Sequence, residues 1–335
     1  MARPTRDDVA RQAQVSGATV SRVLSGRDDL SIAEETRVRV LAAAQRIGYQ
    51  PNPTARALVT GRTGIVGFWM CLGYSRYRSH VVNRMQQVMT PSEFAMAITD
   101  VEEELSRRHT LSRAMRLGVD AIIAFDTPTA GGEFARARAA STGAIPFVSM
   151  GAYWTEATNF VGVDLYAGAV EAMRHLIATG RERIAYLHPA TSEAWPIEAR
   201  HAAYSAVLRE AGYAPHGITT PDVTLATAWR CVRERLASGA QLDAILCHND
   251  DMAIGAYRAL CDLGLRAGPD IALVGCDGIE ETEYLSCPLT TIQQPIDQMC
   301  TLAWQCLQSA MENPGGPLLQ RVLKPKLVIR ESTRR

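Results

Sequence analysis

The sequence predicts an α/β protein in which a small three-helix unit precedes a larger, two-lobed domain built on parallel sheets. Three observations support this fold class. Residues 5–48 carry apolar side chains at helical spacing between turn residues. From residue 64 onward, short apolar runs alternate with helical stretches, as in parallel sheets covered on both faces. A chain of 335 residues is too long for a single hydrophobic core of ordinary size and long enough for a small helical unit followed by two lobes.

Two short helices joined by a tight turn are expected between residues 5 and 25. Thr5 with Asp8 predicts a capping box on the first helix, and Ser16 is a favourable N-cap for the second. The apolar stripe of the second helix contains Val20, Val23 and Leu24. Its opposite face carries the small or polar residues Gly17, Ala18, Ser21 and Arg22.

A third helix is expected to begin at Ser31, with Glu34 completing a second capping box, and to end at Gly48. Its apolar face would contain Val38, Leu41 and Ile47. Residues 1–62 contain ten Arg and six acidic residues, an excess of four positive charges in a chain of zero net charge. A basic unit with a small, polar helix face fits the major groove of DNA, where phosphate contacts release counterions. The alternative is a helical bundle that only packs on another part of the chain.

Several segments resemble the head of lactose repressor/galactose repressor family regulators. They are Asp8-Val9-Ala10, Val15-Ser16, Thr19-Val20-Ser21-Arg22-Val23-Leu24 and Gly48-Tyr49-Gln50-Pro51-Asn52. The resemblance implies that positions 17, 18 and 22 read bases and that positions 16, 19 and 21 hold phosphates. The predicted DNA-binding residues are Thr5, Ser16, Gly17, Ala18, Thr19, Ser21, Arg22, Asn52, Arg56 and Leu58. Gln14 departs from the family, which usually has glycine there, so a slightly different turn is expected.

Residues 51–64 are expected to form a short hinge helix capped by Asn52, with Pro53 at its first position and an end near Val59. An ordinary linker is the alternative, because helices this short are marginal in water. By resemblance, the hinge folds as a pair on DNA, Leu58 wedges into the minor groove, and Arg56 contacts the backbone or groove wall.

The remaining chain alternates strands and helices. Candidate strands are 65–70, 94–98, 121–125, 146–149, 160–163, 184–188, 244–247 and 272–275. Candidate helices are 101–117, 165–179, 197–211, 229–237 and 252–263. The expected organisation is a DNA-binding domain at 1–50, a hinge at 51–63, and an effector-binding and dimerisation domain at 64–335. By resemblance the last is periplasmic-binding-protein-like, with lobes at about 64–160 and 161–290 and a C-terminal part that crosses back.

Polar residues that follow the strands are candidate ligand contacts, because two-lobed sensors bind ligand at the carboxyl ends of their strands. The resemblance extends the effector role to Asp164, Arg200, Asn249 and Asp277. Each also has a purely structural interpretation: helix capping for Asp164 and Asn249, a turn for Asp277, and a surface ion pair for Arg200. Trp69, Phe125 and Trp229 are added as candidate aromatic contacts, with core packing as the alternative.

The leading hypothesis is a transcriptional regulator, in this family most often a repressor, controlled by a sugar-like ligand and bound as a homodimer to a pseudo-palindromic operator. A purine- or nucleoside-responsive corepressor-type regulator is the alternative, and a solute-binding protein is a further one. The eight cysteines lack Cys-x-x-Cys spacing and predict free thiols, and no nucleophile elbow, P-loop or zinc motif is present. No enzymatic activity, metal or cofactor is therefore expected. With no apolar run long enough for a membrane span and no signal peptide, a cytoplasmic location is expected.

Overall fold

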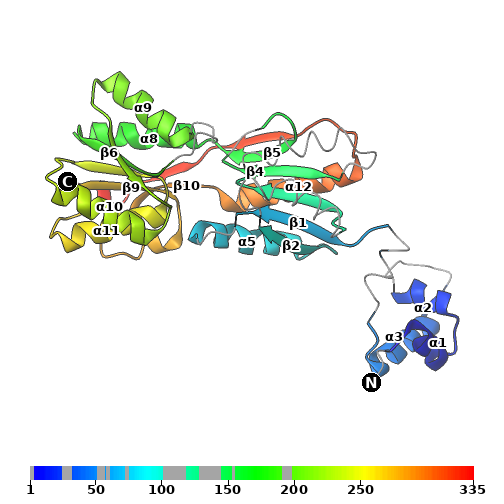
Figure 1. Ribbon diagram of the computed structural model, residues 1–335. Coiled ribbons are helices and arrows are strands. Elements are labelled where there is room, and N and C mark those ends of the chain that lie inside the picture. The colour runs from blue at the N-terminus through cyan, green and yellow to red at the C-terminus, as the bar shows by residue number, and fades with distance from the viewer. Residues whose placement is uncertain are drawn as a thin grey trace. The chain divides into compact units, whose positions relative to one another are not determined.

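The computed structural model describes residues 4–24, 32–50, 57, 61–71, 75–100, 118–127, 145–152, 155–190 and 198–335. The chain divides into two units, Met1–Gly64 and Ile65–Arg335 (Figure 1). The helix expected at 101–117 and the hinge helix lie outside the described residues, apart from Ala57, which is helical. Within the described ranges, no helix has the length and hydrophobicity needed to cross a membrane.

The N-terminal unit contains three helices, α1 (Arg6–Ala13), α2 (Gly17–Leu24) and α3 (Glu34–Ile47). The capping box at Thr5 is confirmed: the backbone N–H of Asp8 donates to its hydroxyl, and the Asp8 carboxylate accepts from the backbone N–H of Thr5 at 3.0 Å. The small core of this unit is formed by Val9, Ala13, Val20, Val23, Val40, Ala43 and Ala44.

Two expectations for α3 are wrong. The helix begins at Glu34 after the N-cap residue Ala33, whose side chain makes no capping bond, instead of at Ser31, which lies outside the described residues. Val38 and Leu41 of the expected apolar face are 56% and 48% exposed, whereas residues 40, 43 and 44 are buried. The third expected residue, Ile47, does pack against the core. A step of two positions along a helix rotates a side chain by about 200°, so the buried positions 40 and 43 lie on a different face from positions 38 and 41.

Gln14 ends α1 in the left-handed conformation, with φ 53° and ψ 47°. Its backbone N–H bonds the carbonyls of Ala10 and Arg11, so the helix ends in the way that glycine usually permits. The turn thus has the geometry of a glycine turn without the glycine, and it carries the strain of a side chain in that region.

The first lobe of the larger unit is built on a six-stranded sheet in which every pair is parallel. Its strands, in spatial order, are β11 (Gln320–Leu323), β5 (Asn159–Val163), β4 (Phe147–Gly151), β3 (Ala121–Phe125), β1 (Ile65–Met70) and β2 (Ala95–Asp100). The helices α5 (Arg76–Met89) and α12 (Ile296–Glu312) pack against each other beside this sheet (Figure 1).

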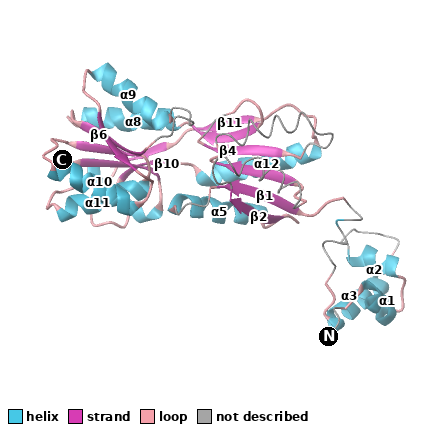
Figure 2. Cartoon of the chain, in the orientation of Figure 1, coloured by secondary structure: helices cyan, strands magenta, loops and turns pink. Residues whose placement is uncertain are grey.

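The second lobe has another six-stranded sheet, parallel except for the antiparallel pair of β10 with β12. Its spatial order is β12 (Lys326–Val328), β10 (Thr290–Gln293), β9 (Ala272–Asp277), β8 (Ala244–Cys247), β6 (Ile184–Pro189) and β7 (His216–Thr220). Helices cover both faces (Figure 2). One face carries α8 (Leu165–Ala178) and α9 (Ala199–Ala211), and the other carries α10 (Leu225–Ala237) and α11 (Asp250–Asp262).

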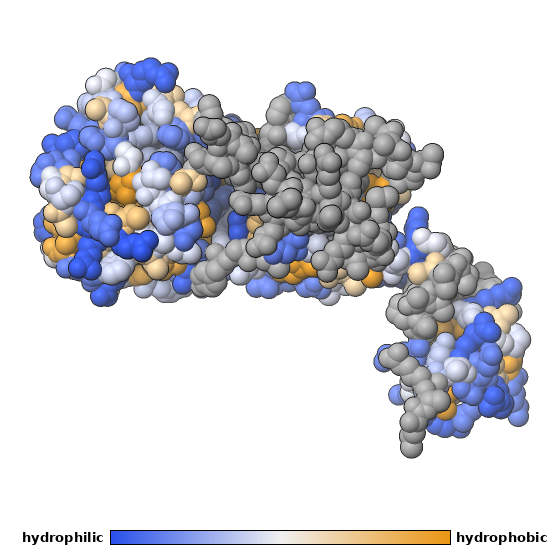
Figure 3. Space-filling view, viewed as in Figure 1, coloured by the Kyte–Doolittle hydropathy of each residue, from blue (hydrophilic) through white to orange (hydrophobic). Residues whose placement is uncertain are grey.

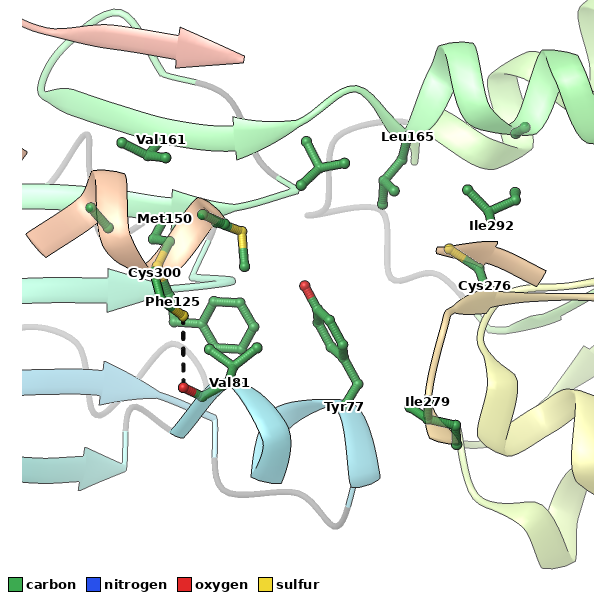
Figure 4. Close-up of a cluster of buried hydrophobic side chains, with 14 of the residues drawn as sticks. Tyr77, Val81, Phe125, Met150, Val161, Leu165, Cys276, Ile279, Ile292 and Cys300 are labelled. Carbon is green, nitrogen blue, oxygen red and sulfur yellow. Dashed lines mark hydrogen bonds between the residues drawn. The ribbon is translucent and has the colours of Figure 1, made fainter. Parts of the chain in front are cut away.

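The chain passes between the lobes three times: after β5, between β10 and α12, and between β11 and β12. Its last residues return to the second lobe as the 3-10 turn Glu331–Thr333, whose residues Ser332 and Thr333 are buried beside β9. There the hydroxyl of Ser332 donates to the carbonyl of Leu273 at 2.6 Å. One hydrophobic cluster continues from the first sheet into the second and joins the lobes (Figure 4).

Candidate functional site

The outer face of α2 is open to solvent, as a DNA-reading face requires. Its exposed residues are Ser16, Ala18, Ser21 and Arg22, and its half-buried ones are Gly17 and Thr19. Val20 and Val23 anchor the opposite face in the core. The hydroxyl of Ser16 accepts the backbone N–H of Thr19 at 3.1 Å and therefore caps the helix as expected. On the side in view, hydrophilic side chains predominate on this unit (Figure 3).

Arg6 adds a cation to this face that sequence reasoning missed. A Cβ atom placed on Gly17 would lie 3.0 Å from Nε of Arg6, so the arginine side chain lies directly over the first turn of α2. Its guanidinium also bonds the carboxylate of Asp7 at 3.1 Å. The missing side chain at position 17 is what lets Arg6 reach this position. The hinge residues Asn52, Arg56 and Leu58 lie outside the described part of the chain.

The region between the two lobes collects polar groups from the carboxyl ends of several strands. Asp126 follows β3 with φ 48°, and Asp277 ends β9 with φ 126°, both in the region that favours glycine. Strain of this kind persists where the surroundings fix the backbone, and it is common at ligand sites. Asn249 follows β8 and caps α11 by accepting the N–H of Met252 at 2.8 Å. Three of these strand ends therefore present amide or carboxyl oxygens.

Arg200 is buried in the second lobe and held by Glu198 and His248. Its Nε donates to Glu198 at 2.6 Å, its Nη1 donates to the His248 carbonyl, and its Nη2 lies 3.2 Å from Nε2 of His248. Because a guanidinium can only donate, Nε2 of His248 must accept, which places the ring proton on Nδ1. That proton points at the hydroxyl of Tyr186, 3.3 Å away, which itself donates to Glu198 at 2.8 Å.

Electrostatics fix the charges of this network. Burial alone would raise the pKa of Glu198, but the charge of Arg200, the neighbouring His248 and the hydrogen bonds from Arg200 and Tyr186 together outweigh it and lower the pKa to about 2. Burial lowers the pKa of His248 to about 3, and the positive charge of Arg200 acts in the same direction. At neutral pH the site therefore contains the ion pair of Glu198 with Arg200 and a neutral His248.

Asp250 and Asp277 form a second buried group. Both carboxyl oxygens of Asp250 are occupied, one by the backbone N–H groups of Gly278 and Ile279 at 2.7 and 2.9 Å and the other by the hydroxyl of Thr291 at 2.7 Å. Burial raises the pKa of Asp250 to about 6. Burial and the charge of Asp250 together raise the pKa of Asp277 well above its usual range.

Two contacts tie these groups to the first lobe, and both start from the first turn of α5. Tyr77 donates its hydroxyl to Gln294 at 2.9 Å, and Gln294 in turn donates its amide to Asp277 at 2.9 Å. Figure 4 shows Tyr77 at the end of α5, between Phe125 of the first lobe and Ile279 of the second. Arg76 forms an ion pair with Asp251 at the start of α11 and another, at 3.3 Å, with Glu281.

The structure does not bring all the predicted effector residues together. Arg200, Asn249 and Asp277 meet at the strand ends of the second lobe. Asp164 caps α8 at the first crossing, where its carboxylate accepts the N–H of Ala167 at 2.9 Å. The three aromatic candidates lie apart from one another. Trp69 packs on Phe147 in a separate cluster, and Phe125 lies in the core beside Tyr77. Trp229 donates its indole N–H to the carboxylate of Asp262 at the far end of α11.

Other possible sites contribute little chemistry. A cavity of about 80 Å³ lies at the opposite, amino-terminal ends of β4 and β5, next to the end of α12, and no charged side chain lines it. Among the described residues, no group of three or more His, Cys, Asp or Glu side chains is arranged to hold a metal ion. The eight cysteines are all free thiols.

Comparison with known proteins agrees with both halves of this description. The model of bacterial regulatory proteins of the lacI family matches residues 5–52, and that of the periplasmic binding protein-like domain matches residues 173–333. The ribose operon repressor of Haemophilus influenzae is 28% identical over 332 residues and 98% of each chain. The transcriptional regulator GalR of Escherichia coli is 29% identical over 333 residues, 98% of this chain and 95% of GalR.

Solved structures add the fold. The lac repressor dimer bound to operator and the anti-inducer ONPF has a TM-score of 0.86 at 24% identity, with all of both chains covered. A helix-turn-helix unit with an exposed outer face thus precedes a two-lobed α/β domain whose polar groups gather between the lobes. The chain combines a lacI-family DNA-binding domain with a periplasmic-binding-protein-like sensor domain and is a DNA-binding transcriptional regulator similar to the ribose operon repressor and GalR.

Proposed function

We propose that the chain is a cytoplasmic, non-enzymatic repressor that binds a pseudo-palindromic operator as a homodimer and is released by a sugar-like ligand. Residues 1–50 would bind DNA, residues 51–63 would form the hinge, and residues 64–335 would bind the effector and dimerise. The observation that carries the proposal is the outer face of α2, which is exposed while Val20 and Val23 hold the opposite face in the core.

On DNA, Arg22 is the residue with the reach for a bidentate contact to guanine, and Ala18 offers a methyl group to thymine. The hydroxyls of Thr5, Ser16, Thr19 and Ser21 would bind phosphates. Arg6 would add a further cation at the same face. The hinge would contribute Asn52 and Arg56 at the backbone and Leu58 as a wedge that kinks the central step.

In the sensor domain, hydroxyl groups of the ligand would bond to Asp277, Asn249 and the free part of Arg200, with Asp126 facing them from the first lobe. Asp164 would contribute from the first crossing between the lobes. A ligand in this position touches both lobes and can therefore favour one lobe arrangement over another, as differential affinity requires. The hinge would then order or melt as the lobe arrangement changes.

The test begins with selection of operator sequences from random DNA by the full-length protein. Arg22→Ala should weaken binding to the selected operator by about 5-fold to 150-fold, corresponding to about 1–3 kcal/mol, and relax the preference at one base pair. Arg39→Ala removes the same charge from the exposed side of α3 and should weaken all sequences alike. Equal losses for Arg22→Ala on operator and random DNA would refute the proposed reading role.

The effector is identified by a thermal-shift panel of sugars, sugar phosphates, nucleosides and purines, because a ligand that binds the folded state raises the melting temperature. A sugar that stabilises the protein and weakens operator binding supports the proposal. A purine or nucleoside that strengthens operator binding would replace it with the corepressor alternative.

A further inference from the structure

We propose that Glu198 sets the charge specificity of the effector site, so that the site takes an uncharged polyhydroxy ligand and rejects ligands that carry a phosphate or carboxylate. The inference rests on the proposed function, because it concerns the ligand of the same site. It begins from the finding that the arginine expected to meet the effector is already paired inside the protein.

Arg200 has little capacity left for an anion. Of the five N–H groups of a guanidinium, four point at protein atoms: one at Glu198, two at the carbonyl of His248 and the sulfur of Cys276, and one at the ring of His248. Its side chain is 7% exposed and that of Glu198 is 10% exposed. The pair is therefore neutral as a unit and shielded from solvent, and one N–H remains for a ligand hydroxyl.

Glu198 is fixed where it stands. As the N-cap of α9 it accepts the backbone N–H groups of Arg200 and His201, each at 3.2 Å, in addition to the side chains of Arg200 and Tyr186. Four hydrogen bonds hold the carboxylate against the guanidinium. An incoming phosphate would have to displace this carboxylate or share the arginine with it, and like charges at contact distance repel.

The groups around the pair reinforce this selectivity. Three further carboxyl groups, those of Asp126, Asp250 and Asp277, interact electrostatically with one another or with Arg200. The guanidinium of Arg78 on α5 also acts on Asp126 and offsets one of these charges. Burial already raises the pKa of Asp277 and of Asp126. An anionic ligand would be repelled by these carboxylates unless they took up protons, and both effects weaken binding. A hydroxyl group can instead donate a hydrogen bond to a carboxylate without repulsion and without a change in protonation.

The experiment measures inorganic phosphate binding to the full-length protein by calorimetry and thermal shift, with chloride at equal ionic strength as the reference. Wild type should show no phosphate binding that depends on Arg200. Glu198→Gln keeps the shape of the side chain but leaves the charge of Arg200 uncompensated, so it should bind phosphate at least about tenfold more tightly. Glu182→Gln removes an exposed carboxylate elsewhere in the same lobe and should behave as wild type.

The double variant Glu198→Gln/Arg200→Gln locates the bound anion. Loss of the gained phosphate affinity in this variant supports the proposal, and its persistence would overturn it, since the anion would then lie elsewhere. Failure of a folded Glu198→Gln to gain phosphate affinity also overturns it. If Glu198→Gln does not fold, the test is made on the wild type. Stabilisation of the wild type by phosphate that is lost in Arg200→Gln contradicts the proposal. No stabilisation of the wild type by phosphate supports it. None of these outcomes depends on finding the sugar, so failure of the proposed function is recognised separately by the ligand panel.

Discussion

Replacing Arg76 with alanine should loosen the connection between the lobes. Its guanidinium pairs with Asp251, whose side chain is 5% exposed, and with the more exposed Glu281 at 3.3 Å. Removing one partner of a fully buried pair costs about 3–5 kcal/mol. Two features reduce the cost here: the Arg76 side chain is 26% exposed, and the backbone N–H at position 76 keeps its bond to Asp251 at 3.2 Å. We therefore expect a loss of about 1–2 kcal/mol.

The measurement is a double-mutant cycle. Urea unfolding gives the free energy of unfolding of the full-length wild type, of Arg76→Ala, of Asp251→Ala and of the double variant, and the coupling energy is calculated from these four values. A coupling energy of about 1 kcal/mol or more is expected. The control cycle uses Arg174→Ala and Glu210→Ala, an ion pair of 3.7 Å whose side chains are 65% and 72% exposed. Such exposed pairs typically contribute about 0.2–1 kcal/mol, and many contribute nothing measurable. If both cycles give the same small coupling, the ion pair does not hold the lobes together and the reasoning is refuted.

Three further predictions follow from the structure. Gln14→Gly should stabilise the N-terminal unit by about 0.5–1 kcal/mol, because glycine relieves the left-handed strain but loses more backbone entropy on folding; a lower melting temperature would contradict this. The pairing of Glu198 with Arg200 lowers the carboxyl pKa from 4.5 to about 2, so its stabilisation is complete above pH 4.5 and is lost as the pH falls toward 2. It amounts to roughly 3 kcal/mol at neutral pH, and the acid unfolding of Glu198→Gln should lack this contribution. Leu58→Ala should weaken operator binding much more than binding to random DNA, and equal losses in titrations on both would exclude the minor-groove wedge.

Local signals in the sequence predicted local structure well. The capping box of Thr5 with Asp8 depends on residues three positions apart, and the structure contains it. The start of α3 was wrong because an alanine, which gives no capping signal, precedes it. Its buried face was predicted only in part, because the helix carries apolar residues on more than one face and packing against α1 and α2 decides which of them are buried. The strands β7, β10, β11 and β12 were missed because they have three to five residues and are defined by pairing with distant strands.

The effector site was predictable only in part for the same reason. Asn249 and Asp277 directly follow apolar strands, so their position at the sheet edge follows from the pattern. The link between Arg76 and Asp251 joins residues 175 positions apart, and no local motif indicates it. Glu198 follows a loop and resembles an ordinary helix cap in sequence. Its pairing with Arg200 becomes visible only when the burial of both side chains is known.

The central claim is that a ligand between the lobes controls DNA binding by the N-terminal unit. The direct test is a fluorescence anisotropy titration of the selected operator with wild type and Asp277→Asn, each with and without the sugar found in the ligand panel. The account predicts that both bind operator equally in the absence of sugar, that the sugar weakens binding by wild type, and that it leaves Asp277→Asn bound. Release of Asp277→Asn at the same sugar concentration as wild type would contradict it.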